Sequence, residues 1–191
     1  MPEWQETEET QLIARAQKGD TEAFGQLYES YAPRLFRFFY ANLENRPDAE
    51  DLTEEVFFRT WKFLPNYRER GAPFGGFLFR VARNLLVDHF RGSGRVTVYE
   101  RFDDILVDGS QENTEWISSE LNELKLVMED LREDYRTVLS LRFLGELTPD
   151  ETAYAMGKSR GAVRVLQHRA LLAARKAMQL NVKGEDETAA E

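Results

Sequence analysis

The sequence predicts an all-α protein of two small helical domains joined by an acidic flexible linker. Apolar residues recur at helical spacing through nearly all of the 191 residues, and no segment alternates apolar and polar residues as a strand does. Between residues 96 and 119 this pattern gives way to acidic and turn-forming residues. The predicted divisions are a first domain at 1–95, the linker at 96–119, a second domain at 120–180 and a disordered tail at 181–191.

Four helices are expected in the first domain. The second should begin at a capping residue, Asp20 or Thr21, and should be bent or interrupted at Pro33. Pro47 and Pro73 mark the starts of the third and fourth helices, because proline suits the first helical turn. The side chains expected to face the core from the first two helices are Leu12, Ile13, Ala16, Phe24, Leu27, Tyr28, Tyr31, Leu35 and Phe39.

The second domain carries sharper signals for helix ends. Helical spacing resumes at Leu121 and should stop at Gly145. Residues 148–151 read T-P-D-E, a capping box with proline at the first helical position. Gly157 then supplies a turn and Ser159 a second cap, which together predict a helix-turn-helix. The buried side of the last helix is expected to hold Val163, Leu166, Ala170, Leu171 and Ala174.

Composition excludes several classes of protein. Cysteine is absent, so neither a disulfide nor a thiolate metal site can form, and the two histidines lie outside any metal-ligand pattern. The N-terminus is acidic and lacks the apolar stretch of a signal peptide, and no apolar run approaches the length of a membrane-spanning helix. We therefore expect a cytoplasmic protein without a cofactor, a bound metal or a membrane-inserted segment.

The helix-turn-helix stands out by charge. The chain as a whole has a net charge of −9, yet no acid lies between Glu151 and Glu185. If Val163 and Ala170 face the core, the opposite side of the helix carries Arg160, Arg164, Gln167 and His168, side chains suited to reading bases in a major groove. This segregation predicts DNA binding. The basic residues of the segment are Lys158, Arg160, Arg164, Arg169, Arg175, Lys176 and Lys183.

A second basic stretch alternates with aromatic residues. Its arginines are Arg68, Arg70, Arg80, Arg83, Arg91 and Arg95, and its rings are Tyr67, Phe74, Phe77, Phe79 and Phe90. Arginines with exposed rings suit single-stranded nucleic acid, since the charges follow the phosphates and the rings stack on unpaired bases. For Phe74, Phe77 and Phe90 we favour a place in the core, whereas Tyr67 lies in a loop and is the best candidate for stacking.

An acidic cluster marks the start of the third helix, at Glu44, Asp48, Glu50, Asp51, Glu54 and Glu55. Asp51 and Glu55 lie one helical turn apart, a spacing that can hold a divalent ion, so a metal-dependent nuclease using Asp48, Asp51 and Glu55 is one alternative. No histidine or lysine accompanies them, and acids also stabilise a helix N-terminus. We favour a docking surface for a basic protein partner over an enzyme.

The order of these segments resembles the extracytoplasmic-function sigma factors, a two-domain group of the sigma-70 superfamily. The motifs are D-A-E-D-L-T-E-E-V-F-F-R-T-W from residue 48, F-L-F-R-V-A-R-N-L-L-V-D-H-F-R from residue 77, and L-R-E-D-Y-R-T-V-L-S-L-R-F-L-G-E-L-T-P-D-E-T-A-Y-A-M-G-K-S-R-G-A-V-R-V-L-Q-H-R-A from residue 131. The resemblance covers about residues 12–178. It implies a sigma-2 domain, a sigma-4 helix-turn-helix and a role in promoter-specific transcription initiation, without catalysis.

The resemblance also implies partners and site residues. RNA polymerase core would be bound through its β′ clamp helices and β flap, and an anti-sigma factor would hold the protein inactive. The implied polymerase-binding residues are Asp48, Glu50, Asp51, Glu54, Glu55 and Trp61. The residues implied to capture the melted strand of the −10 promoter element are Asn66, Tyr67, Arg68, Arg80, Arg83 and Asn84. Those implied to read the −35 element are Lys158, Ser159, Arg160, Arg164, Gln167, His168 and Arg169.

Three residues depart from the family pattern. Phe77 replaces a common tryptophan and Arg132 a common proline, changes that we expect to leave function intact. Thr152 replaces a common isoleucine, and burying its hydroxyl unpaired would cost about 1–3 kcal/mol, which predicts a less stable helix-turn-helix. The alternative function is a stand-alone helix-turn-helix regulator, which would bind its DNA tightly without polymerase.

Overall fold

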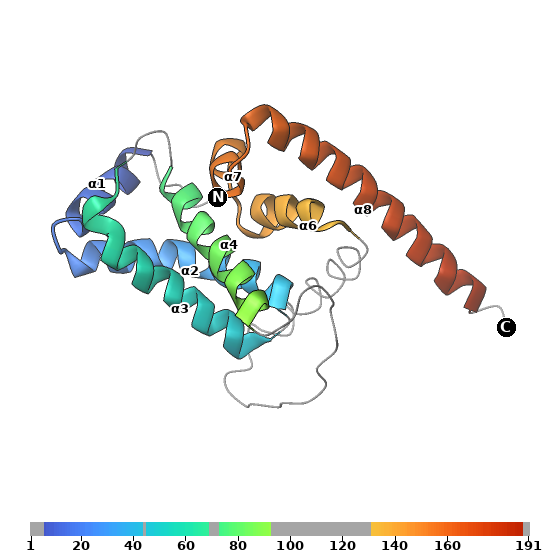
Figure 1. The fold of residues 1–191 in the computed structure, drawn as a ribbon, viewed down its shortest axis with the longest axis horizontal. Coiled ribbons are helices and arrows are strands. Elements are labelled where there is room, and N and C mark those ends of the chain that lie inside the picture. Colours follow the sequence, from blue (N-terminus) through green and yellow to red (C-terminus); the bar gives the residue numbers. More distant parts are fainter. Residues whose placement is uncertain (1–5, 44, 69–72, 93–130, 189–191) are drawn as a thin grey trace.

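The computed structural model describes residues 6–43, 45–68, 73–92 and 131–188, and every element within these ranges is a helix (Figure 1). The all-α prediction is confirmed. The expected linker at 96–119 and the helix expected from Leu121 fall largely outside the described residues.

The N-terminal unit contains four long elements and a short turn. In chain order they are α1 (Glu6–Ala16), α2 (Thr21–Leu43), α3 (Arg46–Phe63), the 3-10 turn η1 (Leu64–Asn66) and α4 (Phe74–Gly92). Helix α2 packs against α1, α3 and α4, and α3 also packs against α4. Four of the eight largest fully buried side chains of this unit are aromatic rings; the eight are Phe38, Phe39, Phe74, Phe79, Leu35, Leu64, Leu78 and Val56.

Local side-chain bonds set the helix starts. The Asp20 carboxylate accepts the backbone N–H of Ala23 at 3.0 Å, so Asp20 rather than Thr21 caps α2. Asn45 caps α3 in the same way, accepting the N–H of Asp48 at 3.2 Å. Helix α2 continues through Pro33 without interruption. Pro33 is exposed, so water can reach the carbonyl group that loses its helical partner there.

The C-terminal unit contains α6 (Glu133–Leu139), the π-helical turn η2 (Ser140–Leu144), α7 (Pro149–Met156) and α8 (Arg160–Thr188). The capping box at α7 is confirmed. The Thr148 hydroxyl accepts the Glu151 N–H at 3.3 Å, and the Glu151 carboxylate accepts the Thr148 N–H at 2.7 Å. Gly157 ends α7 with φ of 63°, a left-handed conformation that glycine adopts without strain.

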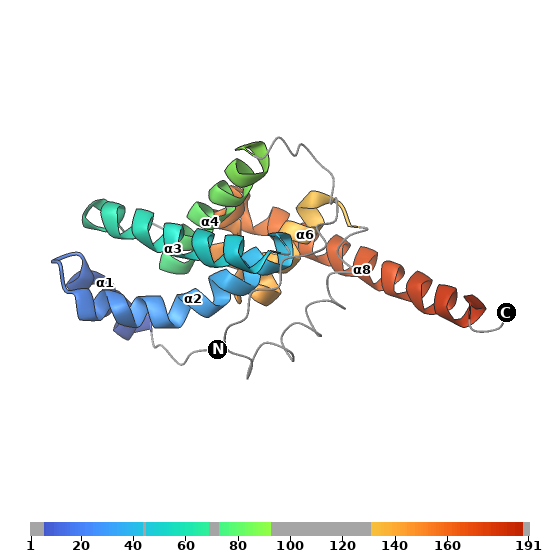
Figure 2. The ribbon, with the colours of Figure 1, turned by 90° about the horizontal axis from the view of Figure 1, so that it is seen from below.

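Helix α8 projects away from the rest of the chain in both views, with the C-terminus at its far end (Figures 1 and 2). Its backbone remains helical to Thr188. A tail without structure was expected from residue 181, so the helix extends further than the sequence pattern indicated.

Two expected core residues lie at the surface. Tyr28 is 40% exposed, although its ring still lies 4.5 Å from that of Phe57. Leu171 is 43% exposed, because the buried side of α8 follows a seven-residue spacing through Val163, Ala170 and Ala177. Leu171 follows Ala170 directly and is therefore turned about 100° away from that side.

Thr152 does not carry the predicted penalty. Its side chain is fully buried, but its hydroxyl donates a hydrogen bond to the Thr148 carbonyl at 2.8 Å. The same carbonyl also accepts the Thr152 backbone N–H at 2.9 Å. The hydroxyl is paired within its own helical turn, so the expected loss of stability has no basis.

The two units pack directly against each other. Helix α7 lies along α4, and η2 contacts α2 (Figure 1). In this structure a buried interface joins the two units.

Candidate nucleic-acid interface

Helix α8 presents a basic face at its N-terminal end. Val163 is fully buried within the C-terminal unit. Arg160 and Arg164 therefore point outward, and both are exposed. The Ser159 hydroxyl accepts the Ala162 N–H at 3.2 Å and so caps the helix as expected. All seven predicted −35 residues lie within two and a half turns of this helix start, and six of them, all but Gln167, are exposed: Lys158, Ser159, Arg160, Arg164, His168 and Arg169.

Gln167 has a structural partner. Its side-chain oxygen accepts a hydrogen bond from Arg142 Nε at 3.3 Å, and Arg142 also bonds the Leu147 carbonyl. This network ties η2 to α8 and orients the Gln167 amide. Arg160 is restrained more weakly, by an exposed ion pair with Asp150 at 3.3 Å, which contributes little to stability.

The predicted −10 residues divide between two places. Asn66 and Arg68 are exposed at the end of η1, and Arg80, Arg83 and Asn84 lie one turn apart on one side of α4. The loop at 69–72 that connects these two groups is outside the described residues.

Tyr67 is a correction to the predicted site. It is only 5% exposed, and its ring lies 5.6 Å from Phe74 and 5.2 Å from Phe77. Its carbonyl accepts a hydrogen bond from Gln17 at 2.7 Å, which fixes the turn. Tyr67 therefore builds the core beneath the basic surface and does not offer its face to a base in this structure. Phe77, which replaces the common tryptophan, is half-buried in the same cluster.

Glu44 lies outside the described residues. The other acidic residues of the cluster lie on α3, away from its buried Ala49, Val56 and Thr60. Some of their charge is neutralised locally. Arg46 pairs with Glu50 and Arg59 with Glu55, each at 2.7 Å, and His89 lies 3.7 Å from Asp48. Asp51 and Glu54 are exposed and form no ion pair with any described residue. These two carboxylates are the ones most available to a basic partner.

An exposed ring accompanies them. Phe58 is 53% exposed on the same side of α3, with the Lys62 ammonium 3.8 Å from its ring centre. The sequence analysis did not single it out. The sequence does contain a signal for this exposed ring, namely the adjacent pair Phe57 and Phe58. Neighbouring residues on a helix point about 100° apart, so the two rings cannot both face the same core. Trp61 behaves in the opposite way: its ring lies 4.7 Å from Phe24 and is half-buried against the core.

Arg34 is a second residue that the sequence analysis missed. It is a buried arginine in α2, at the helical spacing of its buried neighbours Tyr31 and Phe38.

Burial raises the pKa of the Tyr31 phenol well above its ordinary value. The carboxylate of Glu9, to which the phenol donates a hydrogen bond, raises this pKa further. Tyr31 is therefore neutral and acts as a hydrogen-bond donor to Glu9 within the N-terminal unit.

Neither a metal site nor a membrane span is found in the described ranges. No group of three or more His, Cys, Asp or Glu side chains there is placed to hold a metal ion, so Asp48, Asp51 and Glu55 do not form one. Each described helix is too short or too polar to span a bilayer.

Comparison with known proteins shows the family of the chain. Residues 27–96 match the family profile of Sigma-70 region 2, and residues 127–176 match that of Sigma-70, region 4. The ECF RNA polymerase sigma factor SigD of Mycobacterium tuberculosis is 33% identical over 170 residues, which cover 84% of this chain and 79% of SigD. ShbA of Streptomyces griseus, another ECF RNA polymerase sigma factor, is 37% identical over 174 residues, covering 84% of this chain and 90% of ShbA.

The chain belongs to the ECF RNA polymerase sigma factors.

The sigma factor is also similar to BldN of Streptomyces coelicolor, at 37% identity over 164 residues; the match covers 84% of this chain but only 62% of BldN. Among solved structures, CnrH in complex with the cytosolic domain of CnrY superposes with a TM-score of 0.71 at 22% identity, covering 91% of this chain and 98% of CnrH. That likeness shows the fold. The two family profiles identify the N-terminal unit as the sigma-2 domain and the C-terminal unit as the sigma-4 domain of an alternative sigma factor, the class that directs transcription initiation.

Proposed function

We propose that this sigma factor binds RNA polymerase core through α3 and directs it to promoters with two DNA elements. The observation that carries the proposal is the division of charge. Exposed carboxylates gather on α3, while the exposed side of α8 is basic at its N-terminal end. The chain itself supplies no catalytic group to this function, and a role in transcription places it in the cytoplasm.

The −35 element would be read by the start of α8. Duplex DNA admits a helix into its major groove, and the N-terminal residues of a recognition helix contact the base edges. Arg160 and Arg164 project from this end, and an arginine fork can bond guanine O6 and N7 together. Lys158 and Arg169 are placed to contact phosphates on either side, which positions the helix without specifying sequence.

The −10 element would be held as a single strand by α4 and η1. Arg80, Arg83 and Asn84 offer charge and hydrogen bonds along one side of α4, and Arg68 offers a separate exposed charge just after η1. Because Tyr67 is buried, a flipped base has no ring at that position to stack on. We infer that the strand is captured chiefly through its phosphates and base edges.

Core polymerase would dock on α3, at the β′ clamp helices, with the sigma-4 domain contacting the β flap. Opposite charges speed association and fix orientation, and Asp51 and Glu54 are free to supply them. Phe58 adds an exposed ring to the same face, and aromatic side chains often anchor protein interfaces.

An anti-sigma factor is the proposed regulatory partner. A solved structure with a TM-score of 0.60 and 19% identity, covering 82% of this chain and 96% of its counterpart, is the sigma factor RpoE bound to the anti-sigma factor NepR from Bartonella quintana. We propose that this chain is held by a protein of the same kind until transcription of its target genes is required.

The test is promoter binding with and without core polymerase. Promoters are first identified by sequencing the transcripts that core polymerase initiates together with this factor. Gel shifts on these promoters should then show specific complexes only when core is present. Tight specific binding by the free protein, unchanged on adding core, would instead establish a stand-alone regulator.

A further inference from the structure

One side chain on the surface proposed to face the −35 element is apolar. Val165 lies in the second turn of α8 and is 51% exposed. Successive residues of a helix point about 100° apart, so Val165 points about 200° from the buried Val163, away from the core of the sigma-4 domain. It is not among the seven residues assigned to the −35 element. The surface that would enter the major groove therefore has an apolar centre.

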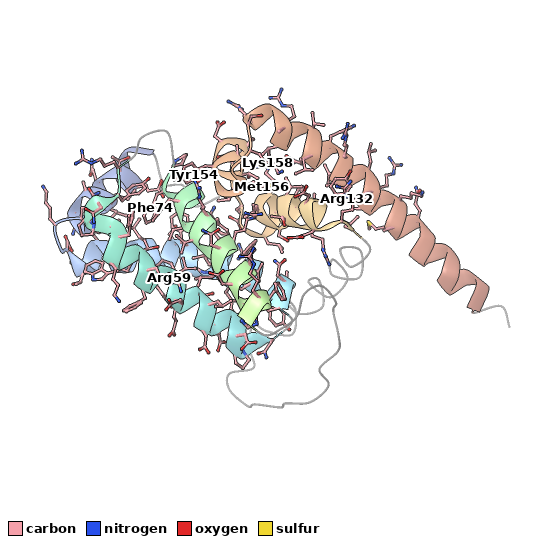
Figure 3. The ribbon with its side chains drawn as sticks, in the orientation of Figure 1. Arg59, Phe74, Arg132, Tyr154, Met156 and Lys158 are labelled. Carbon is pink, nitrogen blue, oxygen red and sulfur yellow. The ribbon has the colours of Figure 1, made fainter. Side chains whose placement is uncertain are left out.

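Basic side chains surround this apolar centre. Arg169 is exposed and lies about 40° from Val165 around the helix axis. Val165 also lines an open depression between α6 and α8, and Figure 3 shows two of the basic residues there, Lys158 at the turn before α8 and Arg132 beside α6. The charged residues that line this depression are Arg132, Asp134, Lys158 and Arg169. A molecule that covers Val165 must therefore accept an excess of positive charge, as DNA does through its phosphates.

Gly161 supports the same interpretation. It lies one turn before Val165 and about 40° from it around the helix axis. A Cβ atom at Gly161 would meet no neighbouring side chain within 4 Å in the described part of the chain, and its φ is not positive. Glycine is less favourable than alanine in a helix, so packing within the chain does not explain it. A bare backbone here allows another molecule to approach the helix closely beside Val165.

Thymine is the base whose major-groove edge suits a valine. Guanine, adenine and cytosine present hydrogen-bond donors and acceptors in this groove, whereas thymine also presents its C5 methyl group. A valine placed over a polar edge leaves donors and acceptors without partners, which is unfavourable. A valine placed on the methyl group removes apolar surface of both groups from water. An apolar residue at this position therefore favours thymine by attraction and disfavours the other bases by exclusion.

The valine side chain is also held in place before DNA arrives. The two branches on its Cβ leave one strongly preferred χ1 rotamer in a helix. The helix start that carries it is fixed by the Ser159 cap and by the buried Val163. Little conformational entropy is therefore lost when Val165 contacts a base, in contrast to a long arginine side chain such as that of Arg164.

We propose that Val165 is a specificity-determining residue of the sigma-4 domain. Its methyl groups contact the C5 methyl group of a thymine in the −35 element, while Lys158 and Arg169 contact the flanking phosphates. The promoters that this factor uses then share a thymine at one position of the −35 element, on one of the two strands. This inference rests on the proposed function, because it assigns the start of α8 to the −35 element.

Deoxyuridine tests the contact, because it pairs as thymidine does and lacks only the C5 methyl group. The Kd of the holoenzyme, formed from core polymerase and this factor, is measured for promoter duplexes in which each −35 thymine is replaced in turn. One replacement should weaken binding about three- to fivefold, as expected for the loss of one buried methyl group. In Val165→Ser, which lacks both valine methyl groups, the effect of this replacement should disappear.

Leu172→Ser is the matched control. Leu172 is 55% exposed on nearly the same side of α8 but about two turns further from the helix start, so this variant should keep the wild-type loss on deoxyuridine. Both changes are at the surface, and circular dichroism should show the helix content of the wild-type protein for each.

Three results would overturn the role of Val165. They are a −35 element without a shared thymine, a wild-type Kd that no deoxyuridine changes, and a Val165→Ser variant that loses as much affinity on deoxyuridine as the wild type. A Val165→Ser variant that binds core polymerase weakly but keeps the deoxyuridine effect would make Val165 a protein contact instead. If core and the wild-type factor together initiate from no specific promoter, the proposed function itself fails, and that result is obtained before any base is replaced.

Discussion

Arg34 and the backbone carbonyl of Gly145 are joined by two hydrogen bonds across 111 residues of sequence. One guanidinium edge thereby donates two hydrogen bonds to a single oxygen. Because Arg34 belongs to α2 and Gly145 ends η2, this contact sets the position of the sigma-4 domain on the sigma-2 domain.

Arg34→Ala should therefore separate the domains while each remains folded. Hydrogen bonds to a charged group contribute about 1.5–3 kcal/mol, so the ratio of closed to open molecules should fall at least about tenfold. Small-angle X-ray scattering of the free protein should show a larger radius of gyration, and circular dichroism should show the same helix content. Arg15→Ala is the control. An unchanged radius of gyration would show that other contacts hold the two domains together.

Thr152 allows a test of the paired hydroxyl. Thr152→Val should change the free energy of unfolding by less than about 1 kcal/mol, since the Thr148 carbonyl keeps the bond from the residue 152 backbone N–H. Thr152→Ser keeps the hydroxyl but removes a buried methyl group, which should cost about 1 kcal/mol or more. Urea denaturation measures the free energy of unfolding of both variants and so shows which of them is less stable. Valine proving clearly worse than serine would contradict this account.

Arg164→Ala should reduce discrimination between promoters by about 1–3 kcal/mol, if Arg164 reads a base. Arg175 provides the comparison, since it is exposed on nearly the same side of α8 but three turns further from the helix start. Arg175→Ala should leave the ranking of promoters unchanged. Run-off transcription over a set of −35 variants measures both. Equal profiles for the two alanine variants would exclude base reading by Arg164.

Asp51→Lys combined with Glu54→Lys should weaken core polymerase binding at least about tenfold, because both carboxylates are exposed and form no ion pair within the described ranges. Glu22→Lys combined with Glu29→Lys, two exposed changes on α2, produces the same change in net charge and is the control. Titration of labelled sigma factor with core gives the Kd, and the effect should shrink as salt rises. Normal binding by the double variant would rule out this side of α3 as the docking surface.

Asp20 should contribute an acid-sensitive part of stability. The pKa of its carboxyl is lowered from 3.8, first by the hydrogen bond from the Ala23 N–H and then by the side chain of Arg15. A lowered folded-state pKa means stability that is present above pH 3.8 and is lost as pH falls through the folded value. Asp20→Asn keeps a capping oxygen but cannot titrate. Urea midpoints of wild type and variant should therefore differ at pH 7 and converge below pH 3.8; a constant difference would refute this.

Much of the fold could be predicted from sequence because its determinants are local. The Thr148 capping box, the left-handed Gly157 and the Ser159 cap each depend on side chains within three or four residues of the groups that they bond. Helical spacing likewise indicated which side of α8 is basic, since Val163 and Ala170 had to be buried.

Interactions between distant segments decided the rest. Whether Tyr67 reaches a base or a core depends on Phe74 and Phe77, which approach it only when α4 packs beside η1. One local detail was also missed: the Thr152 hydroxyl is paired with a carbonyl four residues away, and this pairing depends on a side-chain rotamer that periodicity does not specify.

The sequence by itself determined the helices, the helix-turn-helix and the separation of acidic and basic surfaces, since these follow from residue types a few positions apart. Only the tertiary structure decided that the sigma-4 domain packs against α4, and that Arg34 is buried where the two domains meet. The reason is physical: a contact across 111 residues depends on how two completed surfaces fit, and neither surface is visible in a local pattern.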